Sequence, residues 1–288
     1  MDRFAKMHPA FHFVFFICVF ALSVSVLNPV FCTASLVGAL LYIGITRGRE
    51  VLSCLKFVLT IIAVVSIFNM LFAGYGVTEL FSIGNKRFTL EALIYGFNQG
   101  LMLGGTVLWF DIFSHIMDSQ RVVYLLRFAP KSALIFSMVL GFIPRFKRKA
   151  QDIRQARIGL NGGSDDKGIK ERVRNSLNDF SALVGYSVEA GIITSDSMAS
   201  RGYNPAAVQP NRYRMKMADA LLLAACLVST AYVLYSKMSR KILFVFEPRI
   251  YFESFDFVAL VLFCTLCLIP VIIDFAEVMR WKISASRM

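Results

Sequence analysis

The order of apolar and polar positions divides the chain into six apolar segments, several short polar connections and one long polar region. A helix that spans a bilayer needs about 20 mostly apolar residues, and each segment approaches or reaches that length. The segments are 11–27, 30–45, 51–72, 90–113, 221–235 and 255–278. They predict six transmembrane helices, of which the first two form a tight hairpin broken at Asn28-Pro29 and the sixth is kinked at Pro270.

The long polar region has a helical period of its own. Within 146–160, apolar residues recur about every 3.6 positions, which is the pattern of an amphipathic helix. A second amphipathic helix is predicted over about 170–197, and its apolar stripe consists of Leu177, Phe180, Val184, Val188 and Ile192. The segment 161–166 is expected to end the first helix, and Gly202 is expected to cap the second.

Three further segments are interpreted as connections rather than as spans. Residues 132–142 are apolar but too short to cross a membrane, and Pro144 is expected to separate them from the first amphipathic helix. Residues 74–87 are predicted to be a polar connection and 237–249 a loop.

Composition places the chain among integral membrane proteins, because 57% of its 288 residues are hydrophobic and only 17% are charged. The net charge is +12, and residues 115–216 hold 17 of the 31 Lys and Arg but 8 of the 19 Asp and Glu. Lys and Arg accumulate in cytoplasmic loops. This region and both termini are therefore predicted to lie in the cytoplasm, although the four cations of 237–249 depart from the rule.

These patterns predict an all-α, polytopic protein of the cell membrane with three parts. The first part, 1–114, holds N-terminal transmembrane helices. The second, 115–214, is a cytoplasmic region of long amphipathic coupling helices, and the third, 215–288, holds C-terminal transmembrane helices.

The candidate functional residues form two arginine tripeptides, Ala156-Arg157-Ile158 and Ser200-Arg201-Gly202, each near the end of an amphipathic helix. Arginine is always charged and presents a planar fork of N–H donors, which suits docking into an acidic groove on another protein. One interpretation of the helices is that they transmit force from a partner protein, and the other is that they lie on anionic lipid. Lipid binding accounts for the cations of 145–149 but not for an arginine near each helix end.

The runs Arg127-Phe128-Ala129-Pro130, Gly141-Phe142-Ile143-Pro144, Gln155-Ala156-Arg157 and 196–203 resemble those of a known family. They are similar to the transmembrane T component of energy-coupling factor transporters, a family that also holds the membrane subunit of cobalt and biotin uptake systems. The signature of this family is an Ala-Arg-Gly-type tripeptide at the end of each of two cytoplasmic coupling helices. Arg157 and Arg201 occupy those places, whereas Ile158 replaces the first glycine and Ser200 the second alanine.

The resemblance, which covers about 115–205, implies a scaffold and transducer that is not itself an enzyme. It implies that two cytoplasmic ATPase subunits bind the two tripeptides and that these ATPases, rather than this chain, hold ATP and Mg. It also implies that a separate small membrane protein captures the substrate, a vitamin or a transition-metal ion. The sequence leaves open which substrate is carried, whether the two ATPases are identical and whether the substrate-binding subunit is shared.

Gly96, Gly100 and Gly104 recur every four residues in the fourth apolar segment, a spacing that lets helices approach closely. One interpretation is a packing face for the substrate-binding membrane subunit, and the other is packing within the chain.

Two other classes of function stay open. A conventional ABC permease would form the substrate path itself, and such a permease usually has one coupling loop and polar residues along several spans. A membrane-bound, lipid-modifying enzyme would need clustered acids or histidines, and Asp111, His115 and Asp118 come nearest to that. No metal site is predicted, since His8 and His12 have no further ligands nearby, and no catalytic residue is predicted. No P-loop sequence occurs, so the chain is not expected to bind ATP by that mechanism.

Overall fold

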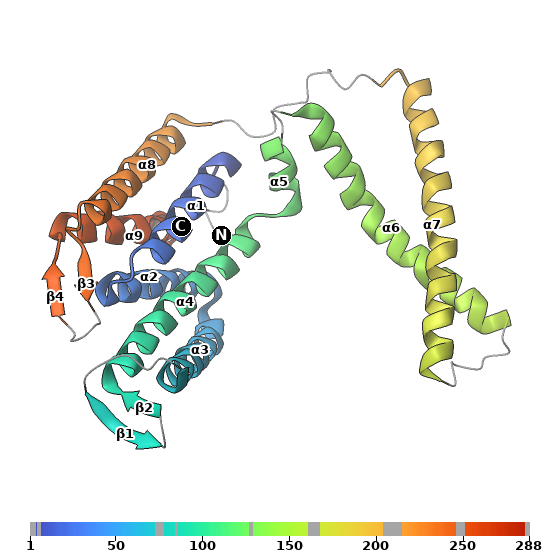
Figure 1. The fold of residues 1–288 in the computed structure, drawn as a ribbon. Helices are drawn as coiled ribbons and strands as arrows, with labels where there is room; N and C mark the ends of the chain where they lie inside the picture. The colour runs from blue at the N-terminus through green and yellow to red at the C-terminus, as the bar shows by residue number, and fades with distance from the viewer. Residues whose placement is uncertain are drawn as a thin grey trace. The chain divides into compact units, whose positions relative to one another are not determined.

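The computed structural model describes residues 4, 7–72, 78–83, 86–126, 129–160, 168–203, 215–245 and 251–285. They form two compact units, each of them mainly helical (Figure 1). Unit 1 consists of Met1–Asp118 and Arg212–Met288, so it joins the two predicted transmembrane parts. Unit 2 consists of Ser119–Asn211 and lies within the predicted coupling region.

The long helices of unit 1 follow the predicted apolar segments closely. They are α1 (Pro9–Ser25), α2 (Pro29–Arg47), α3 (Val51–Phe72), α4 (Leu90–Ile116), α8 (Met217–Met238) and α9 (Phe257–Ala285), with the 3-10 turn η2 (Gly48–Glu50) between α2 and α3. The predicted break at Asn28-Pro29 is confirmed. Asn28 Oδ1 accepts a hydrogen bond of 3.0 Å from the backbone N–H of Val30, and Pro29 occupies the first turn of α2.

The core of unit 1 is rich in aromatic side chains. α4 packs against α2 and α3, α2 packs against α9, and α1 packs against α8 and α4. Phe4, Phe11, Phe15 and Phe16 are fully buried or nearly so, and their rings contact one another or the indole of Trp109. The Trp109 indole N–H donates to Ser35 Oγ at 3.1 Å, so the polar edge of the largest core side chain is satisfied.

Four helices are long and apolar enough to cross a membrane, and the number rises to five if α4 and the following helix are counted as one broken span. The four are α2, α3, α8 and the Phe257–Glu277 part of α9. α1 is apolar but has only 17 residues. The prediction of a mainly helical protein with several helices able to span a membrane is therefore confirmed in its coarse form.

The two connections predicted as irregular contain strands. β1 (Glu79–Ile83) pairs with β2 (Lys86–Thr89) between α3 and α4, and β3 (Leu243–Val245) pairs with β4 (Tyr251–Ser254) between α8 and α9. Both pairs are antiparallel. In the first, Ile83 is opposite Lys86, so two residues, Gly84-Asn85, join the strands. Gly-Asn between β-prone runs is a hairpin signal, and it outweighs the polar composition of the segment.

Asp256 connects the second hairpin region to α9. One of its carboxylate oxygens accepts a bond of 2.6 Å from Ser236 Oγ in α8, and the other accepts from the backbone N–H of Val258 at 3.0 Å. The Ser236 hydroxyl is the main cause that lowers the pKa of the Asp256 carboxyl below 3.8, with the backbone N–H groups of Ala259 and Val258 acting in the same direction. Asp256 therefore caps α9 and ties its start to α8.

Unit 2 contains α5 (Ser119–Leu125), α6 (Pro130–Leu160) and α7 (Ile169–Ser200). The expectation that Pro144 separates two segments is wrong, because Pro144 lies inside α6, a single helix of 31 residues. A proline inside a helix removes one backbone hydrogen bond and crowds the preceding turn. Phe142 and Phe146 stack across this position with ring centroids 5.5 Å apart, which stabilises the helix where that bond is missing.

Candidate functional site

The two predicted amphipathic helices form an antiparallel pair in unit 2. Figure 1 shows α6 and α7 crossing near the carboxyl end of α6 and diverging toward the amino end of α6 and the carboxyl end of α7. At the crossing, the ring of Tyr186 in α7 meets the ring of Phe146 edge-on, with centroids 6.4 Å apart. Lys149 Nζ lies 5.0 Å from the centroid of the same tyrosine ring.

Arg157, the arginine of the first tripeptide, belongs to this crossing. Its Nε donates to both carboxylate oxygens of Asp179 in α7, at 3.0 and 3.2 Å. The two side chains are only 18% and 20% exposed, so their charges are partly desolvated and the ion pair is stronger than a fully exposed one. Arg157 therefore joins α6 to α7, and it is not presented alone to a partner.

Asp179 was not among the sequence-predicted residues. It stands 22 positions after Arg157, across the segment 161–167, and no sequence spacing rule connects the two residues. Their contact depends on how α6 and α7 cross.

The second tripeptide forms the end of α7, and the expectation that Gly202 caps this helix is confirmed. Gly202 has φ +64°, a left-handed conformation that glycine adopts without steric cost. The Gly202 N–H donates to the carbonyl of Ala199 and the Tyr203 N–H to that of Met198, both at 3.0 Å. These two bonds define a Schellman motif with Arg201 at the C-cap position.

The cap leaves the second tripeptide on the surface of unit 2. Ser200, Arg201 and Gly202 are all exposed, and Ser200 Oγ donates back to the carbonyl of Asp196 at 2.8 Å. Within the part of the chain that the structure describes, no acidic side chain pairs with Arg201. In the first tripeptide, Ala156 is exposed, whereas Arg157 and Ile158 are half-buried. The two arginines thus have different surroundings.

The apolar stripe of α7 faces away from α6. Asp179 and Tyr186, which contact α6, lie on one side of the helix. The opposite side carries apolar side chains that are each between 43% and 63% exposed: Val173, Leu177, Phe180, Val184, Val188 and Ile192. An uncovered apolar stripe of this length on a helix is typical of a surface that contacts another molecule or lipid.

The glycine stripe of α4 faces α3. A Cβ added at Gly96 would lie 2.8 Å from Ser66 Cα, one at Gly100 would lie 2.8 Å from Ile62 Cα, and one at Gly104 would lie 2.9 Å from Val58 Cγ1. The three glycines therefore let the backbones of α3 and α4 approach closely. These contacts support packing within the chain, and the side of α4 that bears the glycines is already covered.

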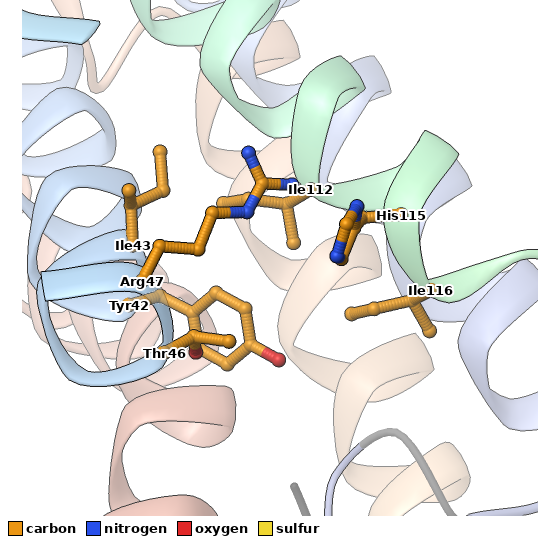
Figure 2. A pocket seen from close by; sticks show the side chains of 7 residues that line it. All are labelled: Tyr42, Ile43, Thr46, Arg47, Ile112, His115 and Ile116. Atoms are coloured by element: carbon orange, nitrogen blue, oxygen red, sulfur yellow. The ribbon is translucent and has the colours of Figure 1, made fainter. Parts of the chain in front are cut away.

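Asp111 and His115 border a small cavity between α2 and α4. Arg47 at the end of α2 donates from Nη1 to Asp111 Oδ2 at 2.8 Å, an ion pair that joins the two helices. The cavity has a volume of about 50 Å³, and its walls are formed by Tyr42, Ile43, Thr46, Arg47, Ile112, His115 and Ile116 (Figure 2). Arg47 was not among the sequence-predicted residues, because its partner Asp111 lies 64 positions away.

The two N-terminal histidines have separate environments. His8 caps α1, where its Nδ1 accepts from the backbone N–H of Ala10 at 3.2 Å. His12 is fully buried between the rings of Phe4 and Phe11. Across the described residues, His, Cys, Asp and Glu side chains form no group of three that could hold a metal ion.

Comparisons with protein-family models and with curated proteins find no match to this chain. The case for its function therefore depends on the residues themselves.

Proposed function

We propose that this chain is the membrane-embedded scaffold and transducer subunit of an energy-coupling factor transporter. In this proposal, two cytoplasmic ATPases bind unit 2, hold ATP and Mg, and close together when ATP binds. Unit 2 passes that movement to the transmembrane helices of unit 1. A separate small membrane protein binds the substrate, a vitamin or a transition-metal ion, and the chain itself carries out no chemistry.

One observation above all supports the proposal: Arg201 is exposed at the Schellman cap of a 32-residue helix. A guanidinium in this position can enter an acidic groove of a partner and form bidentate hydrogen bonds there. The cap fixes the direction in which the chain leaves α7, so the arginine is held in place relative to the helix axis.

The ion pair of Arg157 changes the role proposed for the first tripeptide. Because Arg157 is bound to Asp179, we propose that Ala156 and Ile158 contact the ATPase while Arg157 holds the two coupling helices together. Arg201 then makes the principal charged contact with an ATPase, and force applied at that contact reaches α6 through the crossing.

The proposed membrane topology has six spans, with α1 and α4 added to the four helices that qualify by length and composition. It places unit 2 and both termini in the cytoplasm, in agreement with the concentration of Lys and Arg in 115–216.

The test is purification of the tagged chain from its native host, followed by mass spectrometry of the proteins that accompany it. Two ATPases with P-loop sequences and one small membrane protein are expected. Arg201→Ala is expected to lower ATPase recovery at least tenfold, since loss of one partner of a desolvated charged contact costs about 2–5 kcal/mol. Arg172→Ala, which removes another exposed arginine of α7, is the matched control and should leave recovery unchanged.

Recovery of the chain without any ATPase, or equal ATPase recovery with Arg201→Ala and with the control, would contradict the proposal. A single chain that transports a substrate would indicate a conventional permease. A single chain that modifies lipid would indicate a membrane enzyme.

A further inference from the structure

The cavity between α2 and α4 contains one hydroxyl group that has an unusual environment. Six other helical threonines, Thr33, Thr60, Thr106, Thr194, Thr230 and Thr265, donate from Oγ1 to a carbonyl of their own helix. Thr46 does not, and its Oγ1 is buried with no hydrogen-bond partner among the described residues. A buried hydroxyl without a hydrogen-bond partner destabilises the folded protein. A ligand bound in the cavity would supply the missing partner.

Thr46 shares the cavity with two nitrogen donors. Arg47 is 18% exposed, and only its Nη1 forms a hydrogen bond within the described part of the chain, to Asp111. That bond fixes the guanidinium and leaves its Nε and Nη2 donors for another acceptor. Figure 2 shows the Arg47 guanidinium and the His115 ring facing the same space from α2 and α4, with the Thr46 side chain on its border.

The position of the cavity narrows the choice of ligand. Arg47 is the last residue of α2, and His115 lies in the last turn of α4. Cations at the carboxyl end of a helix are favoured by the helix dipole alone, but the dipole does not account for the Thr46 hydroxyl. A spanning helix ends at the membrane interface, where basic pockets between helices bind lipid headgroups.

We propose that this cavity is a binding site for the phosphodiester group of a membrane phospholipid. Arg47 and Thr46 donate to its oxygens, and the His115 ring lies beside them. A cavity of about 50 Å³ exceeds the space that one water molecule needs and suits a phosphate group. Asp111 at 2.8 Å and Glu50 at 3.6 Å from Arg47 Nη1 offset the charge of this guanidinium, so its contribution to the site is hydrogen-bond donation. A singly charged phosphodiester therefore fits better than inorganic phosphate, part of which is a dianion at pH 7.

The experiment measures binding of three probes to the full chain purified in a non-ionic detergent: dioctanoyl phosphatidylglycerol, dioctanoylglycerol and inorganic phosphate. Phosphatidylglycerol is expected to bind, and dioctanoylglycerol, which lacks the phosphate, is expected to bind at least tenfold more weakly. Thr46→Val keeps the shape of the side chain and the Arg47–Asp111 pair, and it should weaken phosphatidylglycerol binding about fivefold. Thr33→Val is the matched control, because it removes a hydroxyl from the same helix that bonds to its own carbonyl.

Arg47→Gln should weaken binding tenfold or more, and His115→Phe provides a second variant that leaves the ion pair intact. Equal binding by Thr46→Val and Thr33→Val, or equal binding of phosphatidylglycerol and dioctanoylglycerol, would overturn the proposal. Binding of inorganic phosphate in preference to the lipid would overturn the assignment to a phosphodiester and indicate a site for a free anion.

Discussion

Arg157 donates from Nε to both oxygens of Asp179, at 3.0 and 3.2 Å, and this ion pair joins the ends of α6 and α7 that lie next to the 161–167 segment. An arginine that the sequence indicates as a contact for a partner protein is thus also a contact within unit 2. Because of this ion pair, the first tripeptide has a role within unit 2 that the second does not share. The ion pair can be tested by substitution of Asp179, which belongs to neither tripeptide.

Asp179→Asn is expected to loosen the α6–α7 pair without changing either tripeptide. Loss of the charged partner should cost about 1–2 kcal/mol, because the pair is partly buried. The measurement is hydrogen–deuterium exchange of unit 2 in the full chain, where backbone amides of both helices should exchange faster. Glu189→Gln, an exposed acid in the same helix, is the control. Unchanged exchange with Asp179→Asn would show that the ion pair does not hold the helices together.

Gly100→Ala is expected to destabilise the packing of α4 against α3. The added Cβ would lie 2.8 Å from Ile62 Cα, so one helix backbone must move, at a cost of about 1–3 kcal/mol. The measurement is the thermal unfolding midpoint in detergent. Gly105→Ala is the control on the same helix, because its nearest contact beyond α4, the Leu36 backbone nitrogen, would be at an ordinary 3.6 Å. A lower midpoint for the control than for Gly100→Ala would rule out this account of the glycine stripe.

Gly202→Ala is expected to weaken the end of α7. A Cβ in the left-handed conformation at φ +64° costs about 1 kcal/mol, and the Schellman bonds that fix Arg201 become less favourable. ATPase recovery should fall, though less than with Arg201→Ala. Gly202→Asn should be milder, because asparagine tolerates this conformation. Equal losses with alanine and asparagine would contradict this account, and a greater loss with asparagine would indicate that side-chain size at the interface, rather than backbone conformation, matters here.

Asp256→Asn is expected to lower stability at neutral pH and to remove one pH-dependent contribution to it. The pKa of the folded carboxyl lies below 3.8, its ordinary value, chiefly because Ser236 donates to it. The stabilisation is therefore complete above about pH 4 and is lost as pH falls through the lowered pKa. The measurement is the unfolding midpoint from pH 3 to pH 7. The two proteins should differ at neutral pH and converge at low pH, and a constant difference would contradict this assignment.

The apolar segments predicted the long helices well, because burial in a bilayer leaves a continuous signal of about 20 residues. Helix ends were also predicted correctly where the capping residues are adjacent in sequence, as at Asn28-Pro29 and Gly202. The first hairpin was not predicted although Gly84-Asn85 is a local hairpin signal, because the segment 74–87 is polar overall. Continuity of α6 through Pro144 was missed because the stacking of Phe142 on Phe146 is a contact that the helix itself creates.

The candidate site could be predicted only in part. The tripeptide pattern predicts the same role, contact with a partner protein, for Arg157 and Arg201. Their different surroundings depend on Asp179, and the cavity depends on the meeting of Arg47 with Asp111. Contacts between helices distant in sequence are set by crossing geometry, which is not expressed in the periodicity of either helix.

The contact between Arg157 and Asp179 divides α7 into two arms of unequal length. At 1.5 Å per residue, Arg201 lies about 33 Å along the helix axis from Asp179, whereas Ile169 lies about 15 Å from it on the other side. A rotation of α7 about this contact would move Arg201 roughly twice as far as Ile169. In the proposed coupling, a partner that moves Arg201 would therefore produce a smaller displacement at the other end of the helix.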